Sequence, residues 1–565
     1  MFGNWFKRDN DIFLGRQKDS IFFLGMDTRN REIWLNSSIL RQHILVSGTT
    51  GAGKTEALLG MFSNTFAWGS GGIYVDGKGD VALYAKIYAM SEHHGRLNDL
   101  YVLNFMSGSE TSGATMRTHR FNPFAKGNAD TLTRLVISLI PPEDFAQEAR
   151  YGRYARATAM FTGVMRALCW MRDNRNQRLD AGVLYEAIRF NHIVDMANSQ
   201  HYSFLPDQIR KTIRSYLSSI PRYQEDMGYG QSQTTLDEHG ILEMQFARIF
   251  GVMSDAYGHI FCAGTSDIDF ADILWNRRLL HVMLPALEKS SDEISLLGRI
   301  VLSSLRHAIS EVLMSPSRTT DEHPDGNEPI NITGGMPFIS IFDDVSYYMV
   351  EGLDLLAAQA RAVGIGIVFS CGDVRSLSKV SAAALGNIAS SAATKVVMKG
   401  CGSQSELNDI FFDVVGARDD VVAGIDRLIG IDAAGGSPRR SVFRSPSNVV
   451  KHLNEGEFVL VSSGKMLLGK SSYINSFIPM IRNLSGPAHL HDFTAVADMF
   501  VQMTENKKKA ETLQDLPDGM AENFIKPHER SASAAEMLSH ALKVLEAGKM
   551  SQDGSVEEEI IRIGE

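Results

Sequence analysis

The sequence has few cysteines, and their positions suit neither a metal site nor a disulfide framework. Only four occur in 565 residues, and no two of them have the short spacing of a zinc ribbon. They are Cys169, Cys262, Cys371 and Cys401. A zinc ribbon and a disulfide-stapled secreted fold therefore find no support, and a reducing, cytoplasmic setting is favoured.

The sequence also lacks a hydrophobic run long enough to cross a bilayer. Apolar stretches such as 365–370 and 279–287 fall far short of the roughly 20 residues that a transmembrane helix needs. Lys7 and Arg8 lie near the start, but the apolar core of a secretory signal does not follow them. We expect no intrinsic transmembrane helix. Either partners bring the protein to a membrane, or an anchor lies outside this sequence.

Excess positive charge is absent as well. Lys and Arg together number 56 against 66 Asp and Glu, which gives a formal net charge of -10. Such a chain does not coat nucleic acid by bulk electrostatics. DNA as a substrate stays open, because a ring-shaped motor can line a narrow channel with a few basic residues.

Short apolar runs predict a buried parallel sheet. His43–Ser47, Ile73–Val75 and Tyr101–Phe105 are continuous apolar stretches rather than alternating ones, which is typical of strands covered on both faces. The same pattern resumes at Arg278–Leu284. Further strands are expected at 338–342, 365–369, 395–398 and 458–461.

Between about residues 130 and 256 the strand signals vanish. Leu132, Leu135, Val136, Leu139 and Ile140 fall at helical spacing, and further helical stretches follow. This region therefore predicts an all-helical insertion within an α/β fold.

The chain is too long for one compact core, so we expect several segments. They are N-terminal hook or edge strands (1–40), the first part of the core (41–129), an all-α domain (130–256), the second part of the core (257–484) and a C-terminal tail (485–565). In the tail, Ser533 and Glu536 have capping-box spacing before Leu538, Leu542 and Leu545. That amphipathic helix binds a partner or packs back onto the chain.

The strongest chemical signal is a phosphate-binding loop. The motif G-x-x-x-x-G-K-[ST] stands between a predicted strand and a predicted helix, the context that it needs. It consists of Gly48, Thr49, Thr50, Gly51, Ala52, Gly53, Lys54 and Thr55. Its backbone N–H groups and the helix N-terminus favour phosphate. We expect ATP to bind here, with Lys54 on the β- and γ-phosphates and the Thr55 hydroxyl on Mg²⁺.

A second acidic site is expected to hold the metal and orient water. The apolar strand Phe338–Phe342 leads directly into two carboxylates. Asp343 is the candidate for coordinating Mg²⁺ through water, and Asp344 for polarising the attacking water. Asp is one methylene shorter than the Glu usual in this role, so the sequence leaves both normal and slow hydrolysis open.

The turn Asp76–Asp80 follows the second strand, at the edge where such a sheet gathers its ligands. Its charged groups contact nucleotide or a subunit boundary, or else the segment is a plain tight turn. The sequence leaves both interpretations open.

Together these motifs resemble the type IV coupling proteins, VirD/TraD-like P-loop ATPases of the FtsK/HerA branch. The similarity is greatest to the Dot/Icm (type IVB) subgroup, DotL/IcmO-like, and its conjugative-plasmid relatives. It covers roughly residues 20–480. It rests on the P-loop, the turn 76–80, the loop Phe121–Phe124, the runs 102–106 and 160–167, the helical insertion and the late acidic strand.

The resemblance implies a RecA-like nucleotide-binding domain with an inserted all-α domain. It implies a homo-oligomeric, hexameric ring, peripheral at the bacterial inner membrane, that works with secretion-channel components and adaptors. Its substrates would be effector proteins, relaxase–DNA complexes or both. It also implies an arginine acting across the subunit boundary, and the matching position is Arg361.

Two departures from the family pattern leave other functions open. Gly372 stands where members commonly have Gln, and Asp344 replaces a Glu. The motifs and the resemblance together still predict an ATP-driven coupling motor that recruits substrates to a type IV secretion or conjugation channel. The alternatives are a nucleotide-binding receptor with little hydrolysis, or an FtsK/HerA-like cytoplasmic DNA translocase.

Overall fold

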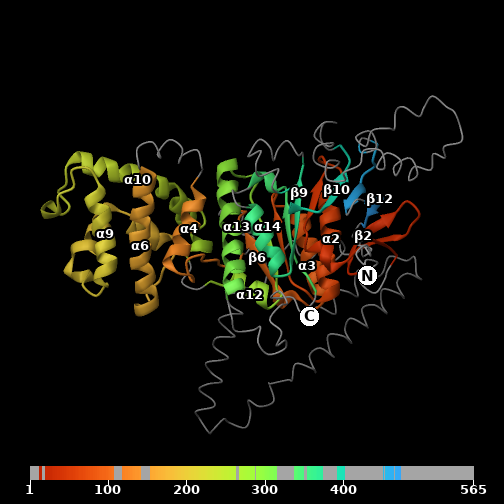
Figure 1. Cartoon of the computed structure of the whole chain (residues 1–565), viewed down its shortest axis with the longest axis horizontal. Coiled ribbons are helices and arrows are strands. Elements are labelled where there is room, and N and C mark those ends of the chain that lie inside the picture. Colours follow the sequence, from red (N-terminus) through yellow and green to blue (C-terminus); the bar gives the residue numbers. More distant parts are fainter. Residues whose placement is uncertain are drawn as a thin grey trace, which may run out of the picture. The chain divides into compact units, whose positions relative to one another are not determined.

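The computed structural model describes most of the chain up to residue 472 (Figure 1). The described residues are 12–15, 20–106, 118–140, 153–262, 266–286, 288–314, 336–348, 353–372, 388, 391–400, 450, 452–462 and 465–472. The predicted tail helix at 533–548 lies outside them.

A 12-stranded sheet forms the centre of the described structure. Its parallel part runs in the order β10-β4-β9-β8-β5-β7-β6. These strands are β10 (Thr394–Met398), β4 (Ile44–Ser47), β9 (Ile365–Cys371), β8 (Phe338–Asp343), β5 (Gly72–Asp76), β7 (Leu279–Met283) and β6 (Leu100–Asn104). All seven belong to the apolar runs that predicted strands. They are buried along almost their whole length, as the continuous apolar pattern requires.

Antiparallel strands extend the sheet beyond β10, in the order β11-β12-β2-β3-β1. They are β11 (Glu457–Ser462), β12 (Lys465–Ser471), β2 (Phe22–Asp27), β3 (Glu32–Leu35) and β1 (Ile12–Leu14). The N-terminal strands thus join the sheet through β12, a strand that the sequence patterns did not predict. Gly25 allows this pairing, because a Cβ there would lie 2.1 Å from the Lys470 carbonyl oxygen.

Helices cover the parallel strands on both faces. The right-handed rule for parallel crossovers puts α2 (Lys54–Trp68) and α3 (Val81–His93) on one face and α13 (Ser291–Met314) and α14 (Leu353–Ala362) on the other. The contacts agree, since α2 packs against α3 and α13 against α14. A short helix, α1 (Ser37–Leu40), precedes β4, and η1 (Leu97–Asp99) precedes β6.

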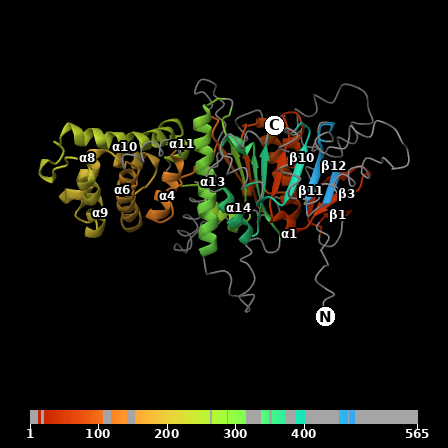
Figure 2. The ribbon, with the colours of Figure 1, turned by 45° about the horizontal axis from the view of Figure 1, so that its top comes forward.

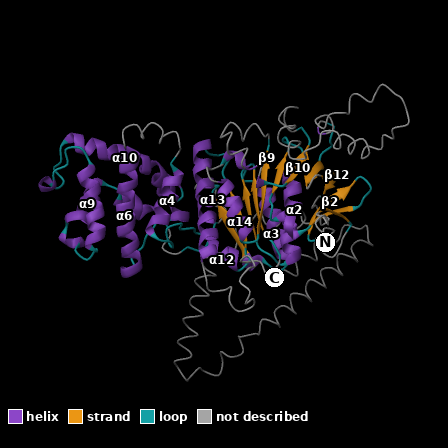
Figure 3. Cartoon of the chain, viewed as in Figure 1, coloured by secondary structure: helices purple, strands orange, loops and turns teal. Residues whose placement is uncertain are grey.

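Between β6 and β7 the described residues form helices and turns but no strand (Figure 3). The helices are α4 (Ala129–Leu139), α6 (Arg153–Arg175), α7 (Ala181–Ala187), α8 (Phe190–Asn198), η4 (Gln200–Tyr202), α9 (Asp207–Ser219), η5 (Glu225–Met227), α10 (Gln233–Gly251), η6 (Val252–Ala256), α11 (Gly258–Phe261) and α12 (Phe270–Trp275). We call this region the helical insertion. The boundary expected at residue 256 falls at the end of the π-helical turn η6, and further helices follow it as far as Trp275.

The helical insertion contacts the sheet domain through α13. In both views α13 stands between the helices α4, α6, α9 and α10 and the strands (Figure 2), and it packs against α4 and α12. One hydrophobic core runs through both regions. The P-loop thus follows β4 inside the sheet, whereas the helical insertion follows β6, the strand at the edge of the sheet. Within the described residues no helix is both long enough and apolar enough to cross a bilayer.

Candidate functional site

The P-loop connects β4 to α2, as its sequence predicts. Gly51 and Gly53 have positive φ angles of 79° and 86°, which a residue with a side chain rarely adopts. Gly48 is constrained by space instead, because a Cβ there would lie 2.8 Å from Met398 Cβ on β10. The glycines of the motif therefore allow the loop to adopt a conformation in which its backbone N–H groups can surround a phosphate.

Lys54, the first residue of α2, lies across this loop. Its side chain is buried, and its Nζ donates to the carbonyl oxygens of Gly48 at 2.7 Å and Thr49 at 3.3 Å. The ammonium is thus held at the mouth of the loop, where a phosphate would replace the carbonyl oxygens as its acceptor.

Asp343, the last residue of β8, faces the P-loop. Thr55 Oγ1 lies 3.3 Å from Asp343 Oδ2, and the Ser370 hydroxyl on β9 donates to Asp343 Oδ1 at 2.9 Å. The Tyr74 hydroxyl on β5 approaches Oδ2 at 3.5 Å. Because β5, β8 and β9 are parallel neighbours, their carboxyl ends bring these groups together.

The Asp343 carboxyl group is buried, and its pKa is raised to about 6. Burial is the largest cause, and the negative charge of Asp344 adds to it; the positive charge of Lys78 acts in the opposite direction. A buried carboxylate that is costly to keep charged is well suited to a cation, which would reduce that cost.

Asp344 stands at the corner after β8 in the left-handed conformation, with φ 47° and ψ 49°. Asp is among the few side chains that tolerate this region. Its Oδ2 is 2.6 Å from Lys78 Nζ, and its side chain is only 6% exposed. The two carboxylates predicted to act together therefore lie side by side, and a lysine neutralises one of them.

The turn 76–80 supplies that lysine. Asp76 accepts hydrogen bonds from the backbone N–H groups of Lys78 at 2.8 Å and Asp80 at 2.5 Å. Asp80 in turn accepts from Ala82 N and caps α3. The carboxylates of Asp76 and Asp80 thus accept hydrogen bonds from nearby backbone N–H groups, as is typical of a tight turn. The sequence indicated that this turn could matter, but it did not identify Lys78 as the residue that reaches Asp344.

Two further residues at this corner were missed. Ser370 is an ordinary strand residue in sequence, and only the order of the strands shows that it meets Asp343. Tyr348 is fully buried and donates from its hydroxyl to the Asp343 carbonyl oxygen at 2.8 Å. A buried tyrosine soon after the acidic pair is the one sequence signal that could have suggested it.

Gly372 follows β9 beside this corner. A Cβ at position 372 would lie 3.9 Å from Asp344 Oδ1, so this position does face the acidic pair. As glycine it brings no polar side chain to Asp344.

Arg361 lies away from the P-loop of its own chain. It is exposed in the last turn of α14, just before β9 begins, and its charge acts on His43, which precedes β4. Both positions belong to the amino ends of their strands, whereas the P-loop follows the carboxyl end of β4. Arg361 therefore does not join its own chain's phosphate site. Action on a neighbouring subunit stays a prediction.

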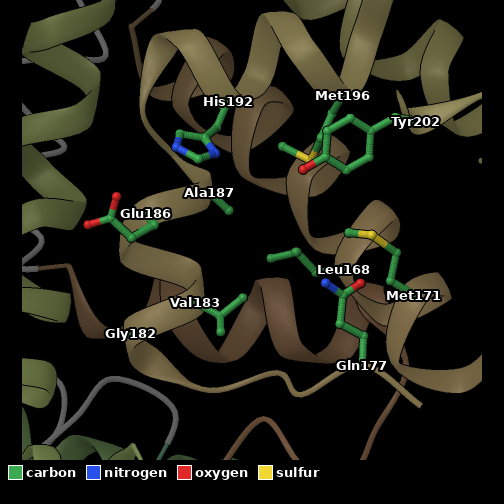
Figure 4. A pocket seen from close by; sticks show the side chains of 10 residues that line it. All are labelled: Leu168, Met171, Gln177, Gly182, Val183, Glu186, Ala187, His192, Met196 and Tyr202. Carbon is green, nitrogen blue, oxygen red and sulfur yellow. The ribbon is translucent and has the colours of Figure 1, made fainter. Parts of the chain in front are cut away.

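A separate cavity of about 350 Å³ lies within the helical insertion (Figure 4). The apolar side chains of Leu168, Met171 and Met196 line it, and Glu186 and His192 stand at its rim. No residue predicted for nucleotide chemistry borders it. The chemistry therefore belongs to the sheet edge rather than to this cavity.

No model of a known protein family matches the chain. The type 4 coupling protein DotL of Legionella pneumophila subsp. pneumophila (strain Philadelphia 1) is 34% identical over 408 residues, which cover 69% of this chain and 52% of DotL. The chain thus spans about half the length of this curated relative.

Solved structures of a second coupling protein resemble the fold. The conjugative coupling protein TrwBdeltaN70 in complex with sulphate aligns with a TM-score of 0.51 and 13% identity, over 81% of this chain and 90% of that chain. The plasmid coupling protein TrwB with ADP and Mg²⁺ aligns with a TM-score of 0.47 and 14% identity, over 78% and 88%.

The match to TrwBdeltaN70 bears on the fold, and the match to DotL bears on the family. The match to TrwBdeltaN70 shows a RecA-like P-loop fold, an α/β sheet domain that carries helical content beyond it. The identity to DotL extends over 408 residues and so exceeds any single motif. The chain belongs to the family of type IV secretion coupling proteins.

Proposed function

We propose that the chain hydrolyses ATP and uses it to drive a coupling step in type IV secretion or conjugation. The observation that carries this proposal is the meeting of Lys54 and Thr55 with Asp343 and Asp344 at one edge of the sheet. This set supplies the parts that phosphoryl transfer to water needs, namely a phosphate cradle, metal ligands and a carboxylate for the water.

The residues fit a magnesium–nucleotide complex. Thr55 Oγ1 and Asp343 Oδ2, 3.3 Å apart, are hard oxygen donors of the kind that Mg²⁺ prefers. Burial and the charge of Asp344 raise the pKa of Asp343, and a bound cation would offset both effects. When bound, the metal would neutralise charge that develops on the phosphates. Lys54 would bind the β- and γ-phosphates, and Asp344 would orient the attacking water.

The family supports assembly into a ring with neighbouring copies, recruited by secretion components at the bacterial inner membrane. Arg361 is exposed and remote from its own P-loop, as an arginine that acts on a neighbour's nucleotide would be. We propose that its cargo is a protein substrate, a relaxase–DNA complex or both.

ATP turnover of the purified protein tests the proposal. Turnover per subunit should rise steeply with protein concentration and vanish in Lys54→Ala. The matched control is Lys211→Ala, which removes an exposed lysine on α9 and should behave as wild type. Stimulation by DNA would favour nucleic-acid cargo. Full turnover by a monomer would contradict the shared site, and turnover in Lys54→Ala would contradict the P-loop assignment.

One observation favours a second candidate function, a receptor that binds ATP but hydrolyses little. Asp344 is engaged by Lys78, and Gly372 brings no side chain to it. In that case Asp344→Asn would leave secretion intact, while Lys54→Ala would abolish it.

A further inference from the structure

Lys78 and Asp344 form an ion pair in which the acid is buried and the base is not. The Asp344 side chain is 6% exposed, and that of Lys78 is 41% exposed. A charge-assisted hydrogen bond of 2.6 Å is strong, and it holds Asp344 Oδ2 against the ammonium. One of the two oxygens of the Asp344 carboxylate is thereby engaged, and this fixes the orientation of the group.

The backbone on both sides of this pair is fixed. Asp76 accepts from Lys78 N and so sets the direction in which the lysine leaves the turn. Gly77 allows the turn to lie against the end of β8, since a Cβ there would lie 2.7 Å from the Asp343 carbonyl oxygen. Asp344 is held in the left-handed conformation beside it. The backbone therefore positions both residues of the pair, unlike an ion pair between two flexible surface side chains.

No other cation serves this corner in the part of the chain that the structure describes. The Lys54 ammonium is bound to the carbonyl oxygens of Gly48 and Thr49. Gly372, on the other side of Asp344, offers no side chain. The charge of Lys78 thus faces two adjacent buried carboxylates and can neutralise only one of them, and a metal ion at Asp343 would supply further positive charge.

We propose that Lys78 is a positioning residue that restrains Asp344 until nucleotide arrives. This inference rests on the proposed hydrolysis of ATP. Before nucleotide binds, the ion pair with Lys78 holds Asp344 Oδ2 and so limits the orientations that this carboxylate can adopt. When ATP arrives, the half-exposed ammonium must release Asp344 before that carboxylate can orient the water, and this release limits the rate of turnover. Slow hydrolysis would then arise in part from this restraint.

Steady-state ATP turnover of the full chain tests the restraint. Lys78→Met keeps the length of the side chain but removes its charge, and it should raise kcat at least about fivefold with little change in KM. Lys78→Arg can re-form the ion pair and should retain most of the restraint. Lys126→Met, which breaks an ion pair with Asp269 in a different part of the chain, is the matched control and should leave kcat unchanged.

The double variant Lys78→Met/Asp344→Asn separates this role from a structural one. Its kcat should fall to that of Asp344→Asn alone, because the gain acts through Asp344. An unchanged or lower kcat in Lys78→Met, with ATP binding intact, would overturn the restraint. If wild type and Lys78→Met both bind ATP through Lys54 but neither hydrolyses it, the restraint and the motor fail together and the receptor remains. Loss of Lys54-dependent binding itself would overturn the proposed function.

Discussion

Thr55 Oγ1 lies 3.3 Å from Asp343 Oδ2, although 288 positions separate the two residues in the sequence. One belongs to the helix after the P-loop and the other to the end of β8, and the parallel sheet brings them together. The pair joins the two halves of the motif that the helical insertion separates. It is the place where nucleotide and metal should have their largest effect on stability.

The first prediction concerns the charge of Asp343. Asp343→Asn removes a carboxylate that burial and Asp344 make costly to ionise, so the protein without ligand should be as stable as wild type or more stable. Stabilisation by ATP with Mg²⁺ should be lost. Thermal unfolding with and without Mg²⁺ measures both effects. A large fall in the Tm of the free protein would instead assign Asp343 to the support of the fold.

A second prediction concerns the hydroxyl that holds Asp343. Ser370→Ala removes the hydrogen bond to Asp343 Oδ1 and should weaken Mg²⁺-dependent ATP binding by about 1 kcal/mol, roughly fivefold. Ser340→Ala, on adjacent β8, is the matched control. Its buried hydroxyl has no hydrogen-bond partner among the described residues, so this variant should bind as wild type. Equal effects of the two variants on binding would contradict an orienting role for Ser370.

The parts of this site that could be predicted from sequence are those in which neighbouring residues carry the chemistry. The P-loop and the Asp343–Asp344 pair are short motifs, and the continuous apolar runs beside them predict their strands. Lys78, Ser370 and Tyr348 could not be assigned in this way. Their roles depend on which strands are neighbours and how closely two turns approach.

The order of the sheet shows the same limit. Pairing of β12 with β2 depends on contacts between distant segments, and β12 contains no long apolar run that would identify it. Local patterns indicate that a strand forms, but they do not say where it joins the sheet. The helical insertion was easier to predict, because the spacing of apolar residues over a few turns is enough to indicate a helix.

A third prediction tests the packing behind the acidic corner. A Cβ added at Gly298, in the middle of α13, would lie 2.2 Å from the Cβ of Tyr348, which holds the Asp343 carbonyl oxygen. Gly298→Ala should therefore destabilise the protein by about 1–3 kcal/mol despite the better helix propensity of Ala. Gly240→Ala, within α10, meets no atom within 4 Å and should stabilise by up to about 1 kcal/mol. Chemical denaturation compares the two, and similar effects would show that Tyr348 moves aside without cost.

A fourth prediction concerns the shared active site. Arg361→Ala and Lys54→Ala should each be inactive in ATP turnover, the first for lack of the arginine and the second for lack of a phosphate ligand. Mixed in equal amounts, they should regain part of the activity, because a Lys54→Ala subunit can present Arg361 to the intact P-loop of an Arg361→Ala neighbour. A mixture as inactive as its components, in rings shown to exchange subunits, would remove Arg361 from the site.

The last prediction concerns two buried histidines that differ in their partners. His281, on β7, lies between the rings of Tyr74 and Tyr84, and within the described structure neither of its ring nitrogens has a hydrogen-bond partner. His43 has both nitrogens engaged: Nε2 donates to Ala357 O at 2.7 Å, and Nδ1 accepts from Ile367 N at 3.1 Å.

Burial lowers the pKa of His281 to about 3 and that of His43 to about 4. The unfolded chain takes up these protons near pH 6.5 and the folded chain does not, so stability is fully present above pH 6.5 and is lost as the pH falls. At pH 5 the loss from His281 alone is about 2 kcal/mol.

His281→Phe keeps the ring contacts, removes two unpartnered nitrogens and should stabilise the protein, most strongly at low pH. His43→Phe should destabilise it at neutral pH, because the Ala357 carbonyl and the Ile367 N–H lose their partner. Urea unfolding at pH 5 and pH 7.5 measures both variants. A loss of stability in His281→Phe at both pH values would contradict this prediction and would mean that the imidazole nitrogens do make a stabilising hydrogen bond.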